Sequence, residues 1–154
     1  MNATSQAITV DLTSKIAHLA VLFRAEFPEA RVDLSPWLTD TKTQRQLDPH
    51  SIDLSFHFPK RNDGLACSCV LIQVHFSGGL LLPDCQLRTI EASGFDRMKQ
   101  QWRFSTEGGE FMGIFVPAKD YETRFRYLIT RIMLLFKHAN RVTSGFDFHQ
   151  SMDR

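Results

Sequence analysis

Two cysteines separated by a single residue are the feature of this sequence best suited to chemistry. The stretch "LACSCVLIQVHF", residues 65–76, places Cys67 and Cys69 inside an otherwise mostly apolar run. Thiolates combine with imidazoles to form tetrahedral zinc sites, and a thiol beside a base can act as a nucleophile. Whether either chemistry is possible depends on which histidine the neighbouring strand places beside the two thiols.

The alternation of apolar and polar residues predicts that these cysteines lie on a strand. "SIDLSFHF", residues 51–58, alternates in the same way, and the polar stretch "PKRNDG" turns the chain between the two strands. An antiparallel pair must keep both apolar sets on one face. One register that does so places His57 opposite Cys67, and a shift by two residues places it opposite Cys69.

His57, Cys67 and Cys69 are therefore the candidate metal ligands, since opposed Cβ atoms lie about 5 Å apart. His75 does not join them, because six residues of strand place it about 20 Å from Cys69. Thiols on apolar strands are more often small packing residues than ligands. We favour no metal site and expect no cofactor, and the sequence offers Cys85 no partner.

Enzyme motifs that could be recognised from sequence are missing. G-x-S-x-G, the P-loop, H-E-x-x-H and G-x-G-x-x-G do not occur. Cys69 with His57 is the one thiol–base pair that the register brings together, and neither a helix N-terminus nor an oxyanion hole accompanies it. The sequence therefore does not favour an enzyme.

The composition of the chain limits which kinds of partner and which cellular compartment we expect. A net charge of +1 argues against a general polyanion binder, so nucleic acid is not an expected ligand. No apolar run reaches the length of a membrane span, and three cysteines in a core-rich chain do not form a disulfide scaffold. We expect one domain spanning residues 1–154, cytoplasmic and with reduced thiols.

Helical periodicity marks both ends of the chain. A helix begins near Asp11, Thr13 or Ser14 and stops at Pro28, and a long helix begins near Ala118 or Asp120 and runs to about residue 140. The tail from about residue 143 is expected to be loosely ordered. About five strands lie between the helices, with a possible short edge strand in "ARVDLSPWL" and a final hairpin strand in "FMGIFVP".

This order predicts an α+β fold, a meander of about five antiparallel strands with both helices packed on one face. Two known architectures resemble it. One is the open sheet with two helices on one face that occurs in many small binding and chaperone modules. The other is the helix-grip arrangement, which implies a first strand in "AITVDL" and an apolar cavity beneath the long helix.

Two further surfaces are candidates for binding. Lys99, Gln101 and Arg103 alternate on the solvent side of one strand and offer a possible ligand face. On the long helix, 100° steps place a stripe away from the core, made of Tyr127, Arg131, Leu134 and His138.

The helix stripe leads us to expect a noncatalytic protein-interaction or assembly module, homodimeric or with another protein partner. The alternative is a small-molecule binding protein or enzyme of helix-grip type with an apolar ligand.

Overall fold

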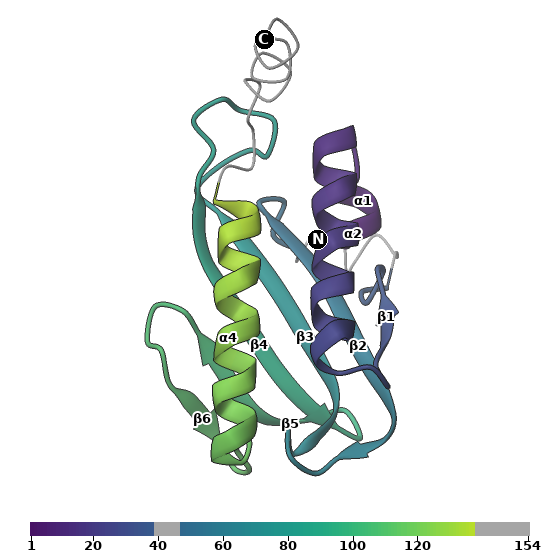
Figure 1. Cartoon of the computed structure of the whole chain (residues 1–154). Helices are drawn as coiled ribbons and strands as arrows, with labels where there is room; N and C mark the ends of the chain where they lie inside the picture. The colour runs from purple at the N-terminus through teal and green to yellow at the C-terminus, as the bar shows by residue number, and fades with distance from the viewer. Residues whose placement is uncertain (39–46, 138–154) are drawn as a thin grey trace, which may run out of the picture.

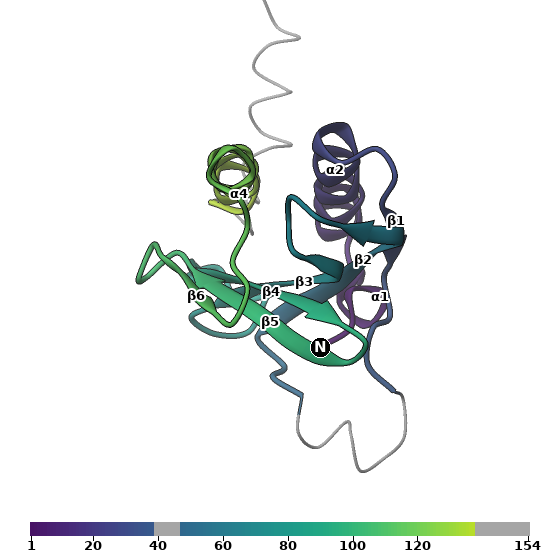
Figure 2. The ribbon, with the colours of Figure 1, turned by 90° about the horizontal axis from the view of Figure 1, so that it is seen from below.

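The computed structural model describes residues 1–38 and 47–137 and shows a six-stranded antiparallel meander in which each strand pairs with the next (Figure 1). The strands are β1 (Arg31–Asp33), β2 (Ser51–Asn62), β3 (Cys67–Phe76), β4 (Leu87–Asp96), β5 (Lys99–Ser105) and β6 (Phe111–Gly113). The helices are α1 (Ala3–Gln6), α2 (Val10–Glu26) and α4 (Lys119–Phe136). Figure 2 shows α2 and α4 side by side on one face of the sheet, so the predicted α+β class and meander are confirmed.

The structure has six strands where about five were predicted. The possible short edge strand in "ARVDLSPWL" is present as β1 and the predicted hairpin strand in "FMGIFVP" as β6, with three residues each. β1 pairs with β2 through Val32 opposite Phe56, and β6 pairs with β5 through Met112 opposite Arg103.

Helix α2 begins earlier than the sequence predicts. The cap is Thr9, whose side-chain oxygen accepts a hydrogen bond from the Leu12 amide at 3.0 Å. Asp11, expected as a cap, lies inside the first turn and forms an ion pair with Lys15 at 2.9 Å. The helix therefore occupies residues 10–12, where a helix-grip fold would have its first strand, and the open-sheet arrangement holds.

Helix α4 buries one face, on which the residues recur at the three- and four-residue steps of a helix: Phe125, Leu128, Ile129, Ile132 and Phe136. Its start near Ala118 is confirmed, since Ala118 is the N-cap. The expected continuation to residue 140 and the expected loose tail lie outside the described residues.

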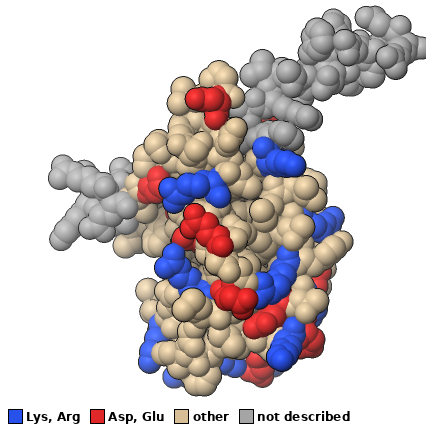
Figure 3. Space-filling view, turned by 90° about the vertical axis from the view of Figure 1, so that its left-hand side faces the viewer, with Lys and Arg blue, Asp and Glu red and all other residues tan. Residues whose placement is uncertain are grey.

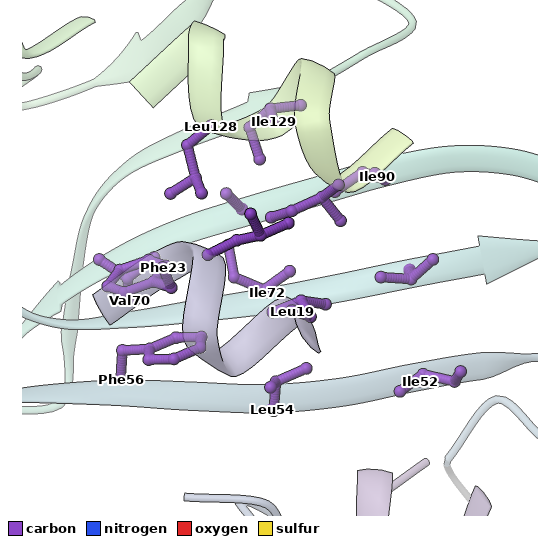
Figure 4. Packing of buried hydrophobic residues seen from close by; sticks show 14 of the residues in the cluster. Leu19, Phe23, Ile52, Leu54, Phe56, Val70, Ile72, Ile90, Leu128 and Ile129 are labelled. Carbon is purple, nitrogen blue, oxygen red and sulfur yellow. The ribbon is translucent and has the colours of Figure 1, made fainter. Parts of the chain in front are cut away.

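The core forms where both helices press aromatic and aliphatic side chains onto the sheet (Figure 4). Phe23 of α2 stacks on Phe56 of β2 with ring centroids 3.7 Å apart and planes within 8°. Phe125 of α4 meets Trp102 of β5 edge to face at 5.5 Å. The Trp102 ring lies over Gly94, where an added Cβ would approach it to 2.3 Å. Side chains thus fill the space beneath α4 in which a helix-grip cavity would lie.

Removing the ring of Phe23 tests this packing. We expect Phe23→Ala to lower the free energy of unfolding by about 3–5 kcal/mol, because the residue is fully buried and leaves a cavity against Phe56. Val21→Ala, on the exposed side of the same helix, should change it by less than about 0.5 kcal/mol. Urea denaturation measures both, and a similar loss for the two variants would contradict the described packing.

Candidate functional site

The sheet face opposite α2 and α4 brings His57 and Cys69 together. They are paired residues in the β2–β3 register, and Cys69 Sγ lies 3.9 Å from His57 Nε2. The same ring nitrogen is 3.0 Å from the Ser55 hydroxyl oxygen. Of the two registers that the sequence leaves open, the structure has the one with His57 opposite Cys69.

Cys67 does not belong to this patch, which corrects the expected trio. The β2–β3 register shifts between His57 and Asn62, so that Asn62 rather than a histidine is opposite Cys67. Just before β3, Ala66 adopts a φ of 57°. Cys67 is completely buried and is part of the hydrophobic core. The irregularity at the hairpin end thus separates two cysteines that a regular strand would keep on one face.

Both thiols are poorly suited to acting as thiolates. Burial, with a smaller contribution from the negative charge of Asp33, raises the pKa of Cys69 to about 11. Burial, followed by proximity to Cys69, raises the pKa of Cys67 to about 12. Thiolate is the form that attacks and that binds metals. Within residues 1–38 and 47–137, no group of three His, Cys, Asp or Glu side chains is arranged to hold a metal ion.

Thiol labelling tests the raised pKa. With a pKa of about 11, about one Cys69 side chain in a thousand is ionised at pH 8. We expect a disulfide reagent to label the folded protein roughly a hundred-fold more slowly than free cysteine, with a rate that rises about ten-fold from pH 8 to pH 9. The unfolded chain is the control for reagent activity. Labelling of Cys69 at the rate of free cysteine would contradict a raised pKa.

Sequence reasoning missed a polar cluster on the same sheet face. His75 Nδ1 lies 3.3 Å from Asp48 Oδ2, and its Nε2 lies 3.5 Å from Glu91 Oε2 without forming a hydrogen bond. Glu91 in turn accepts a hydrogen bond from Arg103 at 3.0 Å. These residues come from three strands and the segment before β2, so no spacing in the sequence signals that they meet. The cluster ties the segment around Asp48 to the sheet.

The contribution of Asp48 in this cluster to the stability of the fold should depend on pH. Burial alone would raise the pKa of Asp48, but hydrogen bonds from the His50 amide and the His75 ring outweigh burial and lower that pKa below its ordinary 3.8. A lowered pKa in the folded state contributes stability above the unfolded pKa and loses it as the pH falls through the folded value. We therefore expect Asp48→Asn to be less stable than wild type at pH 7.

The difference in stability between wild type and Asp48→Asn should shrink as the pH falls below 3.8, because the Asp48 carboxylate of wild type then becomes protonated. Thermal unfolding of both proteins between pH 7 and pH 2 measures it. A difference that stays constant, or grows, in acid would contradict this assignment.

The expected ligand face on β5 is interrupted. The β4–β5 register shifts between Gly94 and Phe95, which leaves Gln101 without an opposite residue. Gln101 is buried and its amide donates to the Lys99 carbonyl oxygen at 3.1 Å. Arg103 is exposed but bound to Glu91. Because the shift breaks the alternation, the three residues do not form one exposed row, which corrects the expectation.

The helix stripe is exposed as expected in its described part. Tyr127 is 60% exposed and Leu134 is 66% exposed. The Arg131 guanidinium lies 5.8 Å above the centre of the Tyr127 ring. His138, the fourth residue of the stripe, lies outside the described residues. Figure 3, seen from the side of β6, shows both signs of charge interspersed among uncharged residues.

An apolar segment at the end of the sheet was also missed as a surface. Met112, Ile114, Phe115 and Val116 are all exposed, although the sequence predicts only a hairpin strand there. Whether these residues are exposed depends on which strand lies at the edge of the sheet, and the sequence pattern does not show that.

A hollow of about 440 Å³ lies where the β2–β3 hairpin meets the start of α4. Phe58, Pro59 and Tyr121 contribute apolar surface to it, and charged side chains from the hairpin and from the turn after α2 also line it. Tyr121, in the first turn of α4, is the helix's contribution to its lining.

Comparisons with known proteins place the chain in a family without assigning an activity. Within the described residues, no helix is long and apolar enough to cross a membrane. Neither a curated protein nor a solved structure matches the chain. A family described as a domain of unknown function matches residues 4–138, which is most of the chain. The chain therefore belongs to this domain family of unknown function.

Proposed function

We propose that this protein is a noncatalytic protein-interaction or assembly module whose partner binds the outer face of α4. The observation that supports the proposal is the exposure of Tyr127 and Leu134, each more than half accessible, on a helix whose inner face is completely packed. Scattered apolar residues on a surface are ordinary, so the support comes from how these two are arranged.

The arrangement is a continuous stripe. Tyr127, Arg131 and Leu134 follow each other at steps of four and three residues, which places them on one side of the helix over about 10 Å. The hydroxyl of Thr130, between them, donates to the Arg126 carbonyl of its own helix at 3.0 Å. That hydroxyl is therefore already bonded within the helix, and the stripe offers a partner mainly rings, methyl groups and one guanidinium.

Arg131 indicates what the partner should carry. Its guanidinium lies against the Tyr127 ring, and no carboxylate of the described residues forms an ion pair with it. A protein surface with an acidic group beside apolar side chains would complement this stripe. Tyrosine and arginine are also, with tryptophan, the residue types enriched among those that contribute most binding energy at protein interfaces.

A second candidate is the binding of a small apolar ligand in the hollow beside Tyr121. Its support is the apolar surface of Phe58 and Tyr121 within an open concavity. A solvent-sensitive apolar dye separates the two functions. Stoichiometric dye binding that Tyr121→Ala abolishes and Leu134→Asp leaves intact would favour the ligand function.

Site-specific photocrosslinking in the host cell tests the interaction proposal. A photoreactive residue in place of Leu134 should give one discrete protein adduct, identified by mass spectrometry. The same residue in place of Val21, which is 64% exposed on α2, is the matched control. The adduct at position 134 should fall at least about ten-fold when Arg131→Glu is added, because the change reverses the charge offered to the partner. Equal adducts at both positions, or an adduct that Arg131→Glu does not reduce, would overturn the proposal.

A further inference from the structure

The hollow at the end of the β2–β3 hairpin is lined by consecutive residues of one segment. Residues 58–64 all contribute to it, together with Glu29 and Tyr121. Side chains of a regular strand point alternately to the two faces of a sheet, so consecutive residues of such a strand do not all line one space. The chain therefore departs from strand geometry where it forms the hollow.

The departure is a large bulge in β2. Among the described strands, the pairing with β1 ends at His57, and between His57 and Asn62 the β2 chain has four residues where β3 has one. Residues 58–61 thus have no opposite residue in β1 or β3. Bulges redirect side chains and are over-represented next to active sites. Figure 2 shows the end of this hairpin bending out of the sheet towards α2 and α4.

Contacts between the hairpin and α4 hold the walls of the hollow in place. The Ala118 amide donates to the Gly64 carbonyl oxygen at 2.8 Å. The Tyr121 ring lies so close to Gly64 that an added Cβ would overlap it. The Phe27 ring stacks with Tyr121 at a centroid distance of 6.3 Å, and the Arg124 guanidinium lies 4.8 Å from the Tyr121 ring centre. The hollow is formed before a ligand arrives, which lowers the entropic cost of binding.

The charged groups of the lining differ in whether they are compensated. Arg61 forms ion pairs with Asp63 at 2.7 Å and with Asp96 at 3.0 Å. The side chains of Lys60 and Glu29 are exposed and form no hydrogen bond or ion pair with the described residues. The hollow therefore combines an aromatic wall with one unpaired cation and one unpaired anion.

We propose that this hollow binds a small zwitterion with an apolar side chain, which is the chemistry of an α-amino acid such as phenylalanine or leucine. The ammonium of the ligand pairs with Glu29, its carboxylate pairs with Lys60, and its side chain contacts Tyr121 and Phe58. The inference rests on the second candidate function, whose hollow it uses, and it is independent of the partner of α4.

Charge complementarity favours a zwitterion over other small ligands. A ligand in the hollow removes water from Lys60 and Glu29, and a charge that loses water without gaining a partner is costly. An apolar anion leaves Glu29 uncompensated, and an apolar amine leaves Lys60 uncompensated. A ligand with both charges compensates both. The volume of about 440 Å³ lies within the range of about 300–1,000 Å³ that is usual for small-molecule sites.

Calorimetric titration of the purified protein with matched ligands tests the proposal. L-phenylalanine carries both charges, whereas phenylpropionate lacks the ammonium and phenethylamine lacks the carboxylate. We expect one L-phenylalanine per chain, and binding of each single-charge ligand that is weaker by at least about ten-fold. A single-charge ligand that binds as tightly as L-phenylalanine would overturn the proposal. Failure of both L-phenylalanine and L-leucine to bind below about 10 mM would also overturn it.

Single substitutions assign each protein charge to one group of the ligand. Glu29→Gln should abolish the preference for L-phenylalanine over phenylpropionate and keep its preference over phenethylamine, because only the partner of the ammonium is lost. Lys60→Met should do the reverse. Glu107→Gln and Lys137→Met, which remove exposed charges outside the hollow, are the matched controls. Preferences that neither Glu29→Gln nor Lys60→Met changes would contradict the assignment, and circular dichroism checks that each variant keeps the fold.

Competition with the apolar dye separates this inference from the second candidate function. We expect L-phenylalanine to displace the dye, and phenylpropionate not to displace it at the same concentration. If Tyr121→Ala abolishes dye binding but neither L-phenylalanine nor L-leucine displaces the dye, the hollow binds an apolar ligand and the zwitterion is excluded. Crosslinking at Leu134 depends on neither result, so it tests the α4 interaction separately.

Discussion

The stacking of Phe23 on Phe56 fixes where everything else in this protein can lie. It attaches α2 to β2 on one face of the sheet, and the Phe125–Trp102 contact attaches α4 to the same face beside it. Because a sheet has two faces and both helices occupy one, the opposite face is left for polar side chains. The outer sides of the helices and the terminal edge remain available to other molecules.

Small irregularities in the sheet then decide which side chains can act together. The shift after His57 separates Cys67 from Cys69, and the shift after Gly94 separates Gln101 from its neighbours. With the pKa of Cys69 raised to about 11, the remaining pair has little thiolate at neutral pH. What the described surface offers in abundance is apolar area on α4 and at β6. This balance favours binding over catalysis as the proposed function.

The long periodic segments and both terminal strands could be predicted from the sequence, whereas the bulges and the short helix α1 could not. The buried face of α4 and the alternation of β2 and β3 arise from local patterns that the tertiary structure keeps. α1 has four residues and is too short to show a period, and a bulge cannot be recognised until the partner strand is known. The meeting of His75 with Asp48 and Glu91 depends on register between distant segments. Exposure at Met112 depends on which strand ends the sheet.

The proposal that this domain acts by binding other proteins is tested most directly by native mass spectrometry of protein isolated gently from its host. The method reports a second copy, another protein and a small ligand in one measurement. We predict species whose mass is that of two chains, or of one chain with another protein. A single chain that carries a small molecule at one-to-one stoichiometry, with no protein complex, would contradict the proposal.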